Sequence, residues 1–160
     1  RRFWFNRFGL SGGSLFKIQK RIIYAIEAVL DIALNAGVNP VQNVAVAKRQ
    51  GIPKRYLEQT LQILVKNNIL VASRGPRGGY RLAKERRKIK ILDIIKSVTT
   101  EKEVNDLYKS NISKIIIQPL IHKFLEESMV YLNKISVEDI YNQYKQKNKD
   151  NSNKKVDFVI

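Results

Sequence analysis

The chain has 160 residues, which is enough for one globular domain with an appended arm, and 44% of them are hydrophobic. It contains no cysteine and one histidine, which excludes disulfides, thiolate catalysis and cysteine-ligated metal clusters, and argues against a histidine-based metal site. No run of about 18 apolar residues occurs, which argues against a membrane-spanning helix.

The positive charge is concentrated in the first half of the chain. The formal net charge is +16. Residues 1–90 hold 19 Lys/Arg against 4 Asp/Glu, whereas residues 91–160 hold 11 against 10. Such an excess on a folded domain favours a polyanion, nucleic acid before a membrane surface, because counterions released on binding contribute much of the binding free energy.

The first segment, residues 1–16, is rich in arginine and aromatic residues and contains no acidic residue. This composition fits a targeting presequence, a membrane-surface arm or a flexible extension. The sequence Ser-Gly-Gly-Ser at positions 11–14 favours the flexible extension, because Gly/Ser runs form flexible joints. We therefore base no function on these residues.

A largely buried helix is predicted over residues 20–36, because apolar residues cover most of its surface. Gly37 and the Asn-Pro pair after it end the helix. Its apolar surface is interrupted by one polar stripe at four-residue spacing, which consists of Glu27, Asp31 and Asn35.

Two further helices with a turn between them are predicted over residues 44–67. Asn43 is a suitable N-cap for a short helix that runs to Gln50, Gly51 permits a sharp reversal, and Pro53 suits the first turn of the second helix. Two helices joined by a glycine-containing turn form a candidate helix-turn-helix. The buried stripe of the second helix consists of Leu57, Leu61, Leu64 and Val65.

The outward face of the second helix carries side chains that can bind DNA. Arg can form two hydrogen bonds with guanine, Gln with adenine, Glu can accept one from cytosine, and Lys or a Tyr hydroxyl can hold a phosphate. Taken alone, this face could equally be a solvated helix surface. The predicted recognition residues are Lys54, Arg55, Tyr56, Glu58 and Gln59, with Gln62 beside them.

A β-hairpin with a basic tip is predicted next, from two short β-type runs at residues 69–73 and 80–83. A phosphate-binding loop is the alternative for its glycines, but that loop requires G-x-x-x-x-G-K-[ST] leading into a helix, which this segment lacks. A thin cationic hairpin fits the minor groove of A·T-rich DNA, whose negative potential attracts arginine. A hairpin after a helix-turn-helix makes a winged helix, and the predicted wing residues are Arg74, Gly75, Arg77, Gly78, Tyr80 and Arg81.

These motifs in this order closely resemble the Rrf-two family of bacterial transcription regulators. The resemblance covers residues 16–144 and rests on Tyr-Leu-Glu-Gln at 56–59, Arg-Gly-Pro-Arg-Gly-Gly-Tyr at 74–80 and Leu-Asp-Ile-Ile at 92–95. It implies homodimers on double-stranded DNA, in which each recognition helix enters a major groove and each wing a minor groove. The residues that match family positions are Arg55, Tyr56 and Glu58 in the recognition helix and Arg74 in the wing.

The chain departs from this family at its metal ligands. Cluster-binding members carry three cysteines before the long dimer helix, and the corresponding residues 99–111 contain none. In some members a histidine is the fourth ligand, and its position falls on Gln118 here, not on His122. We therefore expect no iron–sulfur cluster, no metal and no other cofactor, and we expect His122 to be an ordinary surface or interface residue.

The second half of the chain is predicted to be a dimerisation arm. A short helix over residues 89–98 packs on the winged helix, and a longer one runs from about Asp106 to Asn133. Pro119 must kink the longer helix or mark its restart. Its apolar stripe suggests a partner subunit, with packing inside the monomer as the alternative. The predicted dimer residues are Ile116, Leu120, Phe124, Leu125 and Leu132.

Ser136 and Asp139 resemble a capping box that opens a last helix, which we expect to end at about Gln146. The polar tail is expected to be disordered. The predicted fold class is mainly α with a small β-hairpin. The predicted organisation is an extension (1–16), a winged helix-turn-helix domain (17–98), dimerisation helices (99–145) and a tail (146–160).

The predicted function is a sequence-specific DNA-binding transcriptional regulator, a repressor, that acts as a homodimer on an operator with two half-sites. The expected location is the bacterial cytosol or nucleoid, with a plastid of bacterial ancestry as the other possible host. The alternative function is a winged-helix module that binds nucleic acid or assembles a complex without sequence preference. An enzyme is not expected, because no pair of acids or metal spacing suggests a catalytic site. A protein or small-molecule effector is compatible with this interpretation.

Overall fold

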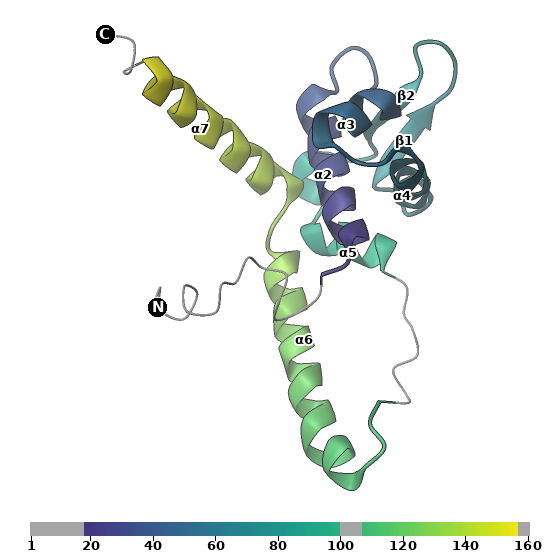
Figure 1. Cartoon of the computed structure of the whole chain (residues 1–160), viewed down its shortest axis with the longest axis vertical. Coiled ribbons are helices and arrows are strands. Elements are labelled where there is room, and N and C mark those ends of the chain that lie inside the picture. Colours follow the sequence, from purple (N-terminus) through teal and green to yellow (C-terminus); the bar gives the residue numbers. More distant parts are fainter. Residues whose placement is uncertain (1–17, 100–106, 157–160) are drawn as a thin grey trace.

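The computed structural model describes residues 18–99 and 107–156. A helical body carries a small hairpin, and two helices project from this body in different directions (Figure 1). The predicted fold class, mainly α with one hairpin, is confirmed. The predicted extension over residues 1–16 lies outside the described residues. No helix in the described ranges is both long enough and apolar enough to span a bilayer.

The body is built around a central helix, α2 (Lys20–Asn35), which contacts α3 (Asn43–Gln50), α4 (Lys54–Lys66) and α5 (Ile91–Val98). The predicted buried helix and the two helices of the helix-turn-helix are therefore confirmed, with Gly51 between the last two. The apolar stripe of α4 faces α2, because its spacing puts every member on one side of the helix. The fully buried side chains of this stripe are Leu57, Leu61 and Leu64.

The polar stripe of α2 contains a buried carboxylate. Asp31 is 1% exposed and accepts hydrogen bonds from Arg49 Nε (2.9 Å), Arg49 Nη2 (2.7 Å) and Gln50 Nε2 (2.7 Å). A buried charge is tolerated only with partners of this kind. The hydrogen bond to Asp31 raises the pKa of Arg49. Because Arg49 and Gln50 end α3, these contacts fix the helix-turn-helix turn on α2.

The predicted hairpin is confirmed, with strands β1 (Leu70–Ser73) and β2 (Gly79–Leu82) in antiparallel register. The segment before α3 pairs with β2 through an isolated antiparallel β-bridge. Val41 donates its N–H to the Tyr80 carbonyl (2.9 Å) and accepts the Tyr80 N–H (2.8 Å). Strand β2 of the hairpin is therefore attached to the chain that leads into the helix-turn-helix.

The long helix of the second half starts later than predicted. Residues 107–110 are not helical, so the predicted start at Asp106 is wrong, because Ser110 Oγ accepts the Ser113 N–H (3.0 Å) and caps the helix there. A π-helical turn, η3 (Ser113–Ile117), then precedes α6 (Gln118–Asn133). Pro119 lies in the first turn of α6, where a missing amide donor costs least. The sequence predicts a kink or a restart at Pro119. The structure shows helical backbone on both sides of this residue, with a change from π-helical to α-helical hydrogen bonding just before it.

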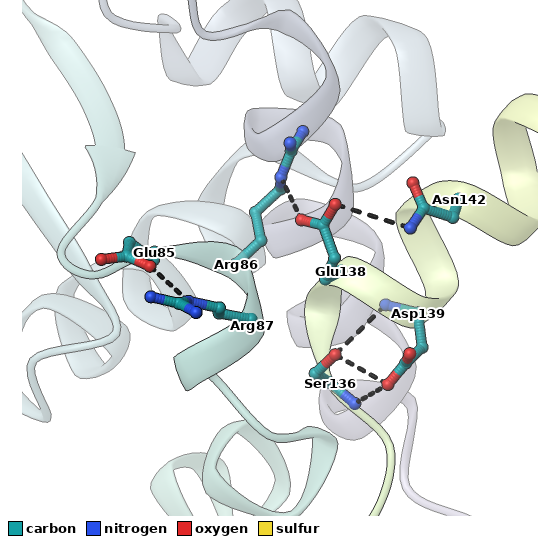
Figure 2. A network of polar contacts seen from close by, with 7 residues as sticks. All are labelled: Glu85, Arg86, Arg87, Ser136, Glu138, Asp139 and Asn142. Atoms are coloured by element: carbon teal, nitrogen blue, oxygen red, sulfur yellow. Dashed lines mark hydrogen bonds and ion pairs between the residues drawn. The ribbon is translucent and has the colours of Figure 1, made fainter.

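The last helix, α7 (Val137–Val156), begins at the predicted capping box, which is confirmed (Figure 2). Asp139 Oδ2 accepts the Ser136 backbone N–H (2.7 Å), and Ser136 Oγ accepts the Asp139 N–H (3.2 Å). The backbone and hydroxyl hydrogen bonds from Ser136 lower the pKa of Asp139. The predicted end near Gln146 is wrong, because α7 continues to Val156 with no Gly or Pro to interrupt it. Residues 157–160 of the predicted tail lie outside the described residues, and the disorder of the tail stays a prediction.

The junction between α6 and α7 is tied to the segment that follows the hairpin. Ile91 donates its N–H to the Ile135 carbonyl (2.9 Å), and Val137 donates its N–H to the Ile89 carbonyl (2.9 Å). We call these two backbone hydrogen bonds the strap. They fix the position of the arm, which consists of η3 and α6, relative to the hairpin.

Arg86, in the short 3-10 helix η1 (Arg86–Lys88), reinforces the strap (Figure 2). Its Nε atom lies 2.7 Å from Glu138 Oε2, and its guanidinium lies over the Tyr141 ring, 3.8 Å from the centroid. Both partners belong to the first turns of α7. The start of α7 is therefore held by one arginine through an ion pair and a cation–π contact.

Replacing Ser136 with alanine should lower the free energy of unfolding by about 1 kcal/mol, because the α7 amide of Asp139 loses its acceptor. Urea denaturation followed by circular dichroism measures this change. Ser128→Ala is the matched control, since that hydroxyl donates to a carbonyl inside α6 and caps nothing. An equal loss in both variants would contradict the capping role.

Candidate nucleic-acid interface

The outward face of α4 brings the predicted recognition residues together. Its buried stripe points to α2, so the opposite side of the helix faces solvent. Tyr56 is exposed but touches Tyr24 edge-on, with ring centroids 6.4 Å apart. Glu58 is half-buried, whereas the exposed members of the face are Lys54, Arg55, Tyr56, Gln59 and Gln62.

Glu58 is held by a residue of the preceding helix. The prediction that Asn43 caps α3 is wrong, because Gln42 occupies the N-cap position and no side chain caps that end. Asn43 is the first residue of the helix, and its Nδ2 donates to Glu58 Oε1 at 3.3 Å. The two helices of the motif are therefore linked by a polar contact at the recognition face.

The tip of the hairpin is narrow and cationic, as predicted. Arg74 and Arg77 are exposed on either side of Pro76, and the Gly78 N–H donates to the Gly75 carbonyl (2.9 Å), which closes the tip. A Cβ atom at Gly78 would lie 2.3 Å from the Ser73 carbonyl oxygen. Only glycine fits this turn, so the tip presents its arginines on a thin backbone.

Two of the predicted wing residues lie within strand β2 instead of at the tip of the hairpin. Tyr80 pairs with Val41 through the backbone and packs against the hydrophobic core. The guanidinium of Arg81 donates to the carbonyls of Gly37 and Val38, in the loop after α2. The structure therefore gives both residues a role in attaching the wing, and contact with DNA remains a prediction for them.

The wing tip is also linked to the start of α3. Gln42 Nε2 donates to the Pro76 carbonyl across a long hydrogen bond of 3.5 Å. Adjacent residues, Gln42 and Asn43, therefore contact the wing tip and the recognition helix. Sequence reasoning missed both contacts, because their partners lie 34 and 15 residues away and no local pattern links them.

The cations of this face are available to an anionic partner. Among the residues that the structure describes, the carboxylate ion pairs involve other basic groups, such as Arg49, Arg86 and Arg87. In the part of the chain that the structure describes, no carboxylate lies within salt-bridge distance of the cations on the outward face of α4 and at the wing tip. These are Lys54, Arg55, Arg74 and Arg77.

The arm exposes many large apolar side chains. Ile116, Leu120, Phe124 and Leu125, all predicted dimer residues, are 46–61% exposed. Leu132 differs, because it is half-buried and packs against the core of its own chain. An exposed patch of this kind marks an interaction site in a folded protein. We call it the arm surface, and its further members are Ile112, Ile115, Ile117, Ile121, Met129, Val130 and Tyr131.

Comparison with known proteins finds similarity to transcription regulators, not to enzymes. The model of the Rrf2 (Rrf-two) family, described as iron-dependent transcriptional regulator, matches residues 18–143. The HTH-type transcriptional regulator IscR of Escherichia coli O1:K1 is 43% identical over 75 residues, which are 47% of this chain and 46% of that protein. The chain thus aligns with about half the length of the curated relatives it matches.

Solved structures share the fold. The IscR structure from T. potens has a TM-score of 0.67 and 29% identity, and the match covers 80% of this chain and 88% of that one. The structure of CymR, the global cysteine regulator of B. subtilis, has a TM-score of 0.61 and 22% identity, and the match covers 81% of this chain and 98% of that one. At 22% identity, the similarity to CymR shows a shared fold and nothing more.

The residues of this chain do not fit a cysteine-ligated iron cluster. The printed sequence has no cysteine. Within residues 18–99 and 107–156, no group of three or more His, Cys, Asp or Glu side chains could hold a metal ion. His122 is 71% exposed on α6, with its Nδ1 atom 3.6 Å from Glu126 Oε1. The chain therefore lacks the cysteine ligands of an iron–sulfur cluster, although the family is described as iron-dependent.

Proposed function

The chain belongs to the Rrf2 family of transcriptional regulators, and from this we propose that it is a sequence-specific DNA-binding repressor that acts as a homodimer. One observation carries the proposal. The exposed face of α4 and the arginine-bearing hairpin tip are both attached to the start of α3, through Asn43 and Gln42. A helix and a hairpin held in this way can contact one stretch of duplex together.

In the proposed complex, α4 lies in a major groove and the hairpin tip in the adjacent minor groove. Arg55 and Gln59 have the donors that read guanine and adenine, and Glu58 accepts from the cytosine amino group. Arg74 or Arg77 enters the minor groove. Lys54 and the Tyr56 hydroxyl bind phosphates, which fixes the register of the helix on the duplex.

The proposed homodimer pairs the arm surfaces of two protomers and places one α4 on each half-site of the operator. The exposure of this apolar surface supports the pairing, because burying it removes apolar area from water. The operator should then be a pseudo-palindrome, and the protein should act on the DNA of the nucleoid. Regulation would not depend on a cysteine-ligated cluster.

Selection of bound fragments from random duplex DNA tests the function. We expect enrichment of one motif with twofold symmetry and half-site centres about 10 base pairs apart, or a multiple of that distance. A pool that stays random after selection would support the alternative, a nucleic-acid module without sequence preference. An asymmetric motif would contradict the homodimer.

Replacing Arg74 with alanine should lower affinity about tenfold for operators with an A·T-rich minor groove at the wing position, and clearly less for G·C-rich ones. Titration by fluorescence anisotropy at fixed salt measures both. Lys147→Ala on α7 is the matched control for the loss of one exposed positive charge. Equal losses on both operator types would contradict reading of the minor groove by Arg74.

A further inference from the structure

Asn43 holds the only acidic side chain of the outward face of α4. Its amide Nδ2 lies 3.3 Å from Glu58 Oε1, and both residues are half-buried, whereas Arg55 and Gln59 beside them are exposed. We propose that Asn43 is a positioning residue, which aims the Glu58 carboxylate and thereby sets base choice at one position of each half-site. This inference rests on the proposed function.

The side chain of Asn43 has no part in capping its own helix. The N-cap position belongs to Gln42, and no side-chain hydrogen bond satisfies the first amides of α3. The amide of Asn43 reaches across to α4 instead, over a sequence separation of 15 residues. Its hydrogen bond therefore acts on the recognition helix.

A carboxylate at a DNA surface needs such a partner because phosphates repel it and few base atoms attract it. In the major groove it can accept only from exocyclic amino groups, and its expected partner is the cytosine N4 amino group. The ionised carboxylate has about four acceptor positions, so one hydrogen bond from Asn43 leaves the others for a base. A neutral amide also leaves the negative charge in place, which a lysine or arginine partner would cancel.

The competing partners of Glu58 lie one turn before it on α4. Lys54 and Arg55 stand four and three residues earlier, the spacing at which opposite charges pair along a helix. Among the described residues, neither forms a salt bridge with Glu58. The contact with Asn43 thus holds the carboxylate away from these cations, and its loss would let Glu58 pair with one of them.

The experiment measures base preference with the full chain. An operator found by selection is changed to each of the four base pairs at every half-site position, and Kd is measured for the unmodified protein, Asn43→Ala, Asn43→Asp and Glu58→Gln. We expect Glu58→Gln to identify one position at which preference falls about tenfold. At this position Asn43→Ala should lower preference about 3- to 10-fold and leave the other positions within about twofold.

Three comparisons between variants sharpen the test. Asn43→Asp keeps the shape of the side chain but faces Glu58 with a second carboxylate, so it should relax preference at least as strongly as alanine does. The double variant Asn43→Ala/Glu58→Gln should show no larger relaxation than Glu58→Gln alone, because Asn43 acts through Glu58. Val44→Ala, at the next, exposed residue of α3, is the matched control and should keep the full preference.

The outcomes distinguish a failure of the proposed function from a failure of the positioning role of Asn43. A protein without any sequence preference contradicts the proposed function. Relaxation by Glu58→Gln together with an unchanged profile in Asn43→Ala and Asn43→Asp overturns the positioning role and leaves the proposed function intact. A uniform loss of affinity on all sequences in the Asn43 variants, with preference retained, also overturns it, since a purely structural role produces that result.

Discussion

Replacing Leu120 and Phe124 with asparagine should convert the proposed homodimer to a monomer and lower its operator affinity about 100-fold. Both side chains lie on the arm surface, one helical turn apart on α6, and about half of each is exposed. Asparagine keeps the net charge constant, so the electrostatic attraction to DNA is unchanged. The operator affinity falls because each monomer must then bind its half-site alone, without a second subunit bound to the neighbouring half-site.

Sedimentation velocity at micromolar concentration measures the first effect, and titration with an operator of two half-sites measures the second. His122→Asn is the matched control, because His122 lies on the same helix with its side chain mostly exposed. The double variant should melt as a folded protein, since neither side chain belongs to the core of the body. A variant that still sediments as a dimer would show that the arm surface is not the subunit interface.

Replacing Asp31 with alanine should lower the free energy of unfolding by about 2 to 3 kcal/mol. The substitution leaves Arg49 and Gln50 without the carboxylate that binds both of them. Removing one partner of a fully buried ion pair costs about 3 to 5 kcal/mol. We expect less here, because the Arg49 side chain is 40% exposed and can turn to water.

Thermal and urea unfolding measure this loss. Asn35→Ala is the matched control, because Asn35 belongs to the same polar stripe but is exposed and hydrogen-bonds only to its own helix. It should change the free energy of unfolding by less than about 0.5 kcal/mol. If Asp31→Ala were as mild as the control, the Asp31 contacts with α3 would be dispensable for the fold.

The elements of the fold follow from local patterns in the sequence. The spacing of Leu57, Leu61 and Leu64 predicts the buried stripe of α4, and the glycines on both sides of Arg77 predict the hairpin tip. The capping box at Ser136 is also local, since its two members lie within one helical turn. Such features depend on neighbours in the chain, so periodicity and turn chemistry are enough to predict them.

The contacts that assemble the candidate site could not be predicted in this way. Asn43 is a good N-cap by composition, and only the packing of α3 on α4 turns its amide to Glu58. Arg81 alternates with apolar neighbours like an exposed strand residue, yet the loop after α2 brings two carbonyls to its guanidinium. Leu132 continues the stripe of the arm, but the bend into α7 directs it to the core. These outcomes depend on tertiary distances that the sequence pattern does not contain.

The strap bears on the layout of the operator. It joins the segment between η1 and α5 to the α6–α7 junction through main-chain atoms of Ile89, Ile91, Ile135 and Val137. These two backbone hydrogen bonds therefore fix the angle at which the arm leaves the body (Figure 1). In the proposed homodimer, that angle sets the distance between the two α4 helices. The number of base pairs between half-sites would then be determined by backbone geometry remote from the DNA, and not by any side chain that touches a base.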